Sequence, residues 1–107
     1  MANENEYTII ISTCPDKIEA DKISEALVEK KIAACVQISE IKSIYSWRGK
    51  IESGQEFRLD IKTRAALFDK AEAVIKELSS YDTPEIVSVP IVRGSRKYLG
   101  WIDEVTF

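Results

Sequence analysis

The chain has 107 residues, of which 45% are hydrophobic and 31% are charged, and its formal net charge at pH 7 is −3. This length is enough for a single domain over residues 1–107 with one hydrophobic core. The acidic balance argues against nucleic-acid partners and against an anionic membrane surface, because phosphate groups are bound by clustered Lys and Arg.

The first two predicted elements are a buried strand and a helix. Tyr7 to Thr13 is a continuous run of apolar and β-branched residues, typical of a central strand covered on both faces. Cys14-Pro15 ends this run. Asp16 and Glu19 have the spacing of a capping box, so we expect a helix to begin there and to end near Ile32.

A long extended stretch follows the helix. Ala33 to Arg48 contains neither Gly nor Pro, and at about 3.3 Å per residue it would span roughly 50 Å. A compact domain of this size has a radius of gyration of only about 13 Å. A turn at Ser53-Gly54 would lead into a return strand, Gln55 to Lys62, that is half as long. We therefore expect the surplus edge to pair with another copy of the chain.

The large side chains of this stretch change face part-way along it. Val36 and Ile38 share one face, whereas Tyr45 and Trp47 share the other. A bulge or bend near Ser39-Glu40 would produce such an exchange. The alternative is two separate strands joined by a turn at the same place.

The remaining elements are a second helix, a fourth strand and a terminal helix. Thr63 is the candidate cap of the second helix, whose apolar stripe consists of Leu67, Ala71, Val74, Ile75 and Leu78. Residues 79–84 form a loop in this interpretation. Glu85 to Val92 is the fourth strand, and Pro90 places it at a sheet edge or a bulge. Ser95 belongs to the turn before the terminal helix.

The order of elements is β-α-β-β-α-β followed by a C-terminal helix. This order predicts an α+β fold of the ferredoxin-like sandwich type. Right-handed crossovers would place both internal helices on one face of an antiparallel sheet, and the long second strand would then be a sheet edge.

Several short motifs occur along the chain: Thr13-Cys14-Pro15-Asp16, Leu27-Val28-Glu29-Lys30-Lys31-Ile32-Ala33-Ala34-Cys35-Val36, Ser43-Ile44-Tyr45-Ser46-Trp47-Arg48-Gly49-Lys50-Ile51-Glu52, Ile61-Lys62-Thr63, Tyr81-Asp82-Thr83-Pro84-Glu85-Ile86 and Tyr98-Leu99-Gly100-Trp101-Ile102. In this order, and over nearly the whole chain, they resemble the CutA family of divalent-cation tolerance proteins. The resemblance implies a homotrimer of ferredoxin-like subunits, similar to the PII signalling proteins, in which the long second strands link neighbours. It also implies a link to copper and other divalent metals.

The sequence departs from this family at the proposed metal ligands. Many members carry histidine just before the Tyr-x-Thr-Pro motif, where this chain has Ser79-Ser80, and the chain has no histidine at all. The thiol ligand proposed for some members falls at Ser12. Cys14, beside a helix N-terminus, is a candidate soft ligand with a lowered pKa, and the alternative is a small residue in a turn. We therefore expect no resident cofactor or metal site, and at most weak binding of a divalent cation such as Cu²⁺.

Two groups of residues are candidates for a ligand site or a subunit contact. Lys62 and Glu85 each lie at a strand end within one of these motifs, and with Tyr81 they would suit a small anionic ligand at a subunit boundary. The alternative is a structural ion pair that orients the trimer interface.

The second group lies at the end of the long stretch. Trp47, Arg48 and Lys50 could stack on and clamp an anion. Alternatively, Tyr45 and Trp47 anchor a subunit contact, because aromatic residues dominate interface hot spots.

The favoured function is a trimeric, non-enzymatic binding or signalling protein associated with divalent-metal tolerance. An acylphosphatase-type enzyme would need an Arg in a Gly-rich loop after the first strand, where this chain has Thr13-Cys14-Pro15-Asp16. An RNA-binding module would need exposed aromatics on the central strands, and a structural trimeric scaffold is the third alternative. The acidic start, the lack of a membrane-length apolar run and two widely spaced cysteines favour a cytoplasmic protein.

Overall fold

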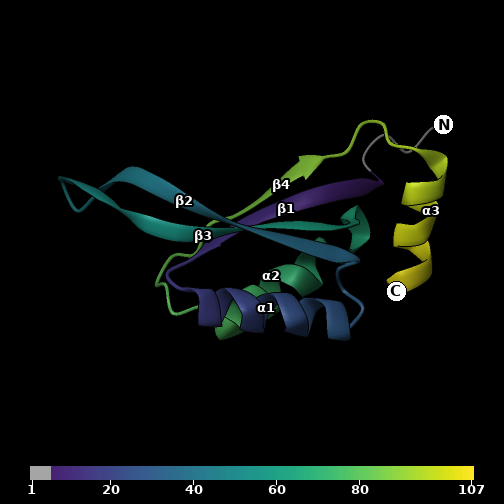
Figure 1. Ribbon diagram of the computed structural model, residues 1–107, viewed down its shortest axis with the longest axis horizontal. Coiled ribbons are helices and arrows are strands. Elements are labelled where there is room, and N and C mark those ends of the chain that lie inside the picture. Colours follow the sequence, from purple (N-terminus) through teal and green to yellow (C-terminus); the bar gives the residue numbers. More distant parts are fainter. Residues whose placement is uncertain (1–5) are drawn as a thin grey trace.

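The computed structural model describes residues 6–107 as a four-stranded antiparallel sheet with two helices packed on one face (Figure 1). In chain order the elements are β1 (Tyr7–Cys14), α1 (Lys17–Glu29), β2 (Cys35–Trp47), β3 (Lys50–Arg64), a 3-10 turn (Ala65–Leu67), α2 (Phe68–Leu78), β4 (Ile86–Pro90) and α3 (Arg96–Val105). The strand order is β2-β3-β1-β4. The predicted α+β order of elements, with β2 at a sheet edge, is therefore confirmed.

The core lies between the sheet and the helices α1 and α2. The buried side chains of β1 and β3 meet those of both helices there, and the largest of them are Ile10, Ile23, Leu27, Leu59, Ile61 and Ile75. Each such side chain contributes about 1.5–3 kcal/mol when it is fully buried. The predicted stripe of α2 is confirmed, since Ala71, Val74 and Ile75 are buried and Leu78 packs against the same core.

The start of α1 follows the predicted capping in part. The Asp16 carboxylate accepts a hydrogen bond from the Glu19 backbone N–H at 2.8 Å. The Glu19 carboxylate accepts from the Ser80 backbone N–H at 3.2 Å, in place of the reciprocal bond of a capping box. This contact joins the beginning of α1 to the loop after α2.

The second helix begins differently from the prediction. Thr63 is a buried residue of β3, and its hydroxyl donates to the Ile32 carbonyl, so it does not cap a helix. The 3-10 turn from Ala65 to Leu67 separates the strand from α2 instead. The fourth strand is shorter than predicted, and Pro90 is its last residue on an outer strand of the sheet.

The β2–β3 hairpin corrects several predictions about the long stretch. β2 and β3 pair without interruption from Cys35↔Lys62 to Trp47↔Lys50, so neither a bulge nor a turn occurs at Ser39-Glu40. The hairpin turns at Arg48-Gly49, whose φ angles are 52° and 78°, and Ser53-Gly54 lies within β3. Positive φ at both central residues is the geometry of a type I′ turn, which matches the twist of the two strands.

The corrected turn also changes the relative lengths of the two strands. β3 has 15 residues and β2 has 13, so the prediction of a return strand half as long is wrong. The large side chains do change face along β2, but they do so in continuous register. Val36 packs against the core, whereas Tyr45 and Trp47, nine and eleven positions further along at odd spacing, point from the opposite face.

The outer half of the hairpin extends beyond the rest of the sheet. β1 pairs only with the Phe57–Arg64 part of β3, so residues 41–47 and 50–56 project as a two-stranded ribbon, here called the arm. Figure 1 shows the arm at the left, past the ends of β1 and β4. The molecule is accordingly elongated, with principal extents of 46 × 27 × 22 Å. Among the described residues, neither outer edge of the arm is paired with another strand.

Candidate functional site

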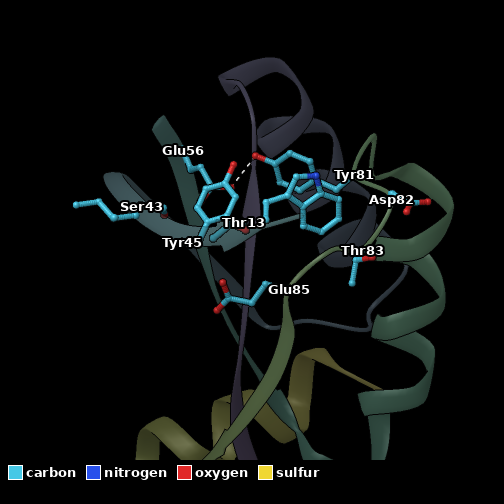
Figure 2. A pocket seen from close by; sticks show the side chains of 10 residues that line it. Thr13, Ser43, Tyr45, Glu56, Tyr81, Asp82, Thr83 and Glu85 are labelled. Carbon is cyan, nitrogen blue, oxygen red and sulfur yellow. Dashed lines mark hydrogen bonds between the residues drawn. The ribbon is translucent and has the colours of Figure 1, made fainter. Parts of the chain in front are cut away.

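A hollow of about 590 Å³ lies at the base of the arm. Its wall is made by the arm, by the end of β1 and by the loop between α2 and β4 (Figure 2). The aromatic and acidic residues that line it are Tyr45, Trp47, Glu56, Tyr81, Asp82 and Glu85. The arm and the loop therefore bring together side chains that lie up to 42 positions apart in the sequence, from Ser43 to Glu85.

A hydrogen bond between Tyr81 and Glu56 fixes the loop against the arm. The Tyr81 hydroxyl donates to a Glu56 carboxylate oxygen at 2.6 Å, which Figure 2 shows as a dashed line. Burial raises the pKa of Tyr81 well above its ordinary value of 10.0, and the hydrogen bond to Glu56 raises it further. Tyr81 consequently stays protonated at neutral pH and acts as a donor toward the carboxylate.

The local sequence explains how the loop reaches this position. Ser79 has an extended backbone that ends α2, and its hydroxyl accepts a hydrogen bond from the Tyr81 N–H at 3.1 Å. The bond from Ser80 to Glu19 holds the preceding residue against α1. Together these contacts direct the Tyr81 ring toward the arm.

Two aromatic rings of β2 form another part of the wall. Tyr45 and Trp47 alternate with Ser46, so both point from the same face of the arm. Their exposed fractions in the single chain are 49% and 42%. The Arg48 guanidinium lies 5.4 Å from the centre of the Trp47 ring, at the tip of the hairpin. The Trp47 ring therefore already attracts one cation.

The structure places four of the six candidate residues around one hollow. Tyr45, Trp47, Tyr81 and Glu85 line it, whereas Arg48 occupies the turn beyond it. Lys62 lies toward the other end of β3, with its ammonium group 5.7 Å from the centre of the Tyr98 ring. The convergence of Lys62 with Tyr81 and Glu85 at a subunit boundary is thus not made within one subunit, and it stays a prediction.

Sequence reasoning missed two acidic residues of the site. Glu56 lies within the predicted return strand, and Asp82 is the variable position of the Tyr-x-Thr-Pro motif, so neither residue has a signal of its own. Pairing Tyr81 with Glu56 requires knowledge of where the arm begins. A turn at Ser53-Gly54 would place Glu56 near the tip of a short hairpin, and no sequence signal places it beside the loop.

The two cysteines do not provide a metal site. Cys14 is the last residue of β1 and is fully buried in the core, so the interpretation as a turn residue is wrong. Burial raises the pKa of the Cys14 thiol to about 12, and the charges of Glu19, Asp16 and Glu56 add to this effect. The alternative of a lowered pKa is therefore wrong as well. Cys35 is a half-buried free thiol at the start of β2.

The described residues do not fit a tight copper or zinc centre. Within residues 6–107, no three Cys, Asp or Glu side chains are grouped as a metal site. The sequence supplies no imidazole ligand, and the thiol of Cys14 stays protonated in the core. Also within this range, no helix is long and apolar enough to cross a membrane.

Comparisons with known proteins agree with the motifs and with the fold. The CutA protein of Archaeoglobus fulgidus, a divalent-cation tolerance protein, is 45% identical over 98 residues, which cover 92% of this chain and 96% of that protein. The solved structure of the periplasmic divalent cation tolerance protein CutA from the same organism superposes with a TM-score of 0.91 at 44% identity, covering 92% of this chain and 97% of that one.

A plant relative extends the comparison and corrects one prediction. The chloroplastic protein CutA of Arabidopsis thaliana is 37% identical over 99 residues, which cover 92% of this chain and 54% of that protein, so the chain spans about half of the plant relative. One relative is thus described as periplasmic and another as chloroplastic. The expected cytoplasmic location is therefore overturned, because acidic first residues and unpaired cysteines do not separate these compartments.

The match extends over almost the whole domain and includes every element that forms the hollow. The sequence model of the family described as CutA1 divalent ion tolerance protein matches residues 8–105, from the beginning of β1 to the end of α3. With this match and the close agreement of the archaeal relative in both sequence and structure, the chain belongs to the CutA1 divalent ion tolerance protein family.

Proposed function

We propose that this protein is a non-enzymatic homotrimer that contributes to divalent-cation tolerance by binding a small ligand at its subunit boundaries. Its relatives are named for tolerance of divalent cations, and the family description uses the same words. The observation that carries the proposal is the arm, which leaves two strand edges and several large side chains exposed in the single chain.

The exposed edges and side chains of the arm support assembly more directly than the relative lengths of β2 and β3 do. Exposed strand edges are a liability that proteins normally cover or pair. The arm exposes 68% of Ile44 and 83% of Ile51, in addition to the aromatic rings on its other face. A contact between the edge of one arm and the next subunit is heterologous, and three such contacts close into a ring without a free edge.

The role of copper in this proposal is indirect or weak. The described residues do not fit a tight copper centre, because the buried Cys14 thiol stays protonated and the sequence contains no histidine. Carboxylates such as Glu85 are hard oxygen donors, which suit weak binding of many divalent cations rather than selective binding of copper. The ligand site of the trimer is instead assigned to the hollow at the base of the arm.

A proline substitution on the edge of the arm tests the assembly. In a hairpin with a two-residue turn, Trp47 and Lys50 exchange hydrogen bonds, so the N–H of Ser46 points outward. Ser46→Pro removes this outward donor and leaves the hairpin bonds in place. Light scattering should report about three times the 12.1 kDa chain mass for the wild type and for the control Ser46→Ala, and a smaller mass for Ser46→Pro.

Two results would count against this proposal. A wild-type chain that remains monomeric at micromolar concentration would remove the trimer altogether. A Ser46→Pro variant that keeps the full trimer mass would show that the outer edge of β2 is not the surface that pairs.

A further inference from the structure

We propose that the hollow at the base of the arm binds a small organic cation that carries an ammonium or guanidinium group. This inference rests on the proposed function, because it names the chemical class of the ligand for the same site. It also reverses the sign of the ligand expected from the sequence, which predicted an anion held by Lys62.

The first support is the charge of the wall. Glu56, Asp82 and Glu85 line the hollow, and none of the described residues that line it is Lys or Arg. Lys62 is six residues from Glu56 along β3, which is about 20 Å in an extended strand. Within the same subunit, the Arg48 guanidinium lies over the Trp47 ring but is not part of the wall. The charges of the wall itself should repel an anion and attract a cation.

The second support concerns the cations that share this sheet face, Lys50, Arg58 and Lys62, none of which lines the hollow. Arg58 follows Glu56 on that face, and its guanidinium is paired with Asp60 at 2.9 Å. The other ion pairs found in residues 6–107 are on the helices, between Lys17 and Asp21 and between Lys76 and Glu72. The carboxylates of the hollow are therefore not neutralised by these groups.

The third support is the aromatic part of the wall. Tyr45, Trp47 and Tyr81 present ring surfaces to the hollow, and ring faces attract ammonium and guanidinium groups. The Arg48 guanidinium over Trp47 shows this preference within the chain itself. The same rings offer apolar surface to a hydrocarbon body, which a bare metal ion lacks.

The size of the hollow favours an organic cation over a metal ion as the ligand. About 590 Å³ is far more than the roughly 30 Å³ that one water molecule occupies in the liquid. The Glu56 carboxylate is held by Tyr81 at one side, so the acidic groups are spread around the wall rather than gathered at one point. A polyatomic cation can reach several of them at once.

Calorimetric titration with putrescine tests the proposal, and succinate is the matched control. Both molecules have a four-carbon backbone, but putrescine carries two ammonium groups and succinate carries two carboxylates. Wild-type protein should bind putrescine saturably, with a Kd below about 1 mM, and should not bind succinate. Added salt should weaken the binding of putrescine, because part of the attraction is electrostatic.

Three carboxylate variants locate the binding. Glu85→Gln and Asp82→Asn each keep the size of a side chain in the wall but remove its charge, and each should weaken putrescine binding by about tenfold. Glu104→Gln removes the same charge from an exposed position of α3, away from the hollow, and should bind like the wild type. Two variants are used so that weaker binding caused by a disturbed loop in one of them is recognised by comparison with the other.

Light scattering on the same samples separates this inference from the proposed function. A trimer that does not bind putrescine, as expected if a side chain of a second copy fills the hollow, overturns the cation site and leaves the assembly standing. A trimer that binds putrescine equally well after Glu85→Gln and Asp82→Asn also overturns it. A monomer that binds putrescine and loses it in these variants supports the cation site and contradicts the trimer.

Discussion

Replacing Cys14 by serine should destabilise the fold by about 2 kcal/mol. The thiol is fully buried at the end of β1, within the cluster that joins β1, β3 and the two helices. Serine has nearly the same shape, but its hydroxyl loses hydration when it is buried, and protein data place this cost at about 1–3 kcal/mol when no partner is present. From the sequence alone, a turn residue at this position would tolerate the same change.

The magnitude can be measured by urea unfolding at a fixed protein concentration, because assembly adds to the apparent stability. With a slope of about 1–1.5 kcal/mol per M for a small domain, the midpoint should fall by roughly 1.3–2 M. Cys14→Ala, which removes the sulfur without adding a polar group, should lose about 1 kcal/mol. Cys35→Ser, at a half-buried strand position, should stay within about 0.5 kcal/mol of the wild type.

The same thiol makes a prediction for the effect of pH. The pKa of Cys14 rises from an ordinary value of 9.0 to about 12 in the fold, so the unfolded chain ionises first as the pH increases. Its contribution to stability is complete below pH 9 and should be lost as the pH rises toward 12. Cys14→Ala should lack this part of the decline. If Cys14→Ser were as stable as the wild type while Cys14→Ala was weaker, the hydroxyl would have a partner, and the reasoning from burial would fail.

Other predictions concern the arm, the metal and a second titrating group. Trp47→Ala should weaken assembly by about 2 kcal/mol and make the melting temperature depend more steeply on protein concentration. The control Ile18→Ala, at an exposed position of α1, should have neither effect. Equal behaviour of the two variants would show that Trp47 is not part of the subunit contact. Calorimetry with Cu²⁺ should give no site tighter than about micromolar, and a tight stoichiometric site would contradict the account of the donor set. The pKa of Tyr7 rises to about 12 through its hydrogen bond to Asp103, so stability should decline as the pH rises from 10.0 to 12, and Tyr7→Phe should make that decline shallower.

Much of the fold could be predicted because its signals are local. The Asp16 cap and the apolar stripe of α2 depend on residues three or four positions apart, and both are present in the structure. The buried strands also follow their alternation, as Leu59 and Ile61 show. Such patterns exist only where a segment has one face against a core.

The sequence does not specify where the arm turns, because the arm has no face against a core. Arg48-Gly49 and Ser53-Gly54 are both acceptable turn sequences, and no alternation of buried and exposed residues chooses between them along the ribbon. The same ambiguity in the position of the turn affects the prediction of the site. Family motifs indicate Tyr81 and Glu85, whereas the assignment of Glu56 to the site requires the register of β2 and β3.

The continuous register of the hairpin limits how chains of this type can change in length. A single residue inserted into one strand between the arm and the core would shift every pair beyond it and turn each side chain to the opposite face. One residue added to each strand would keep the pairing but reverse the faces of the tip. Only two residues added to each strand, or removed from each, would preserve both the pairing and the side on which Tyr45 and Trp47 stand. Evolution should therefore lengthen or shorten this ribbon in steps of four residues.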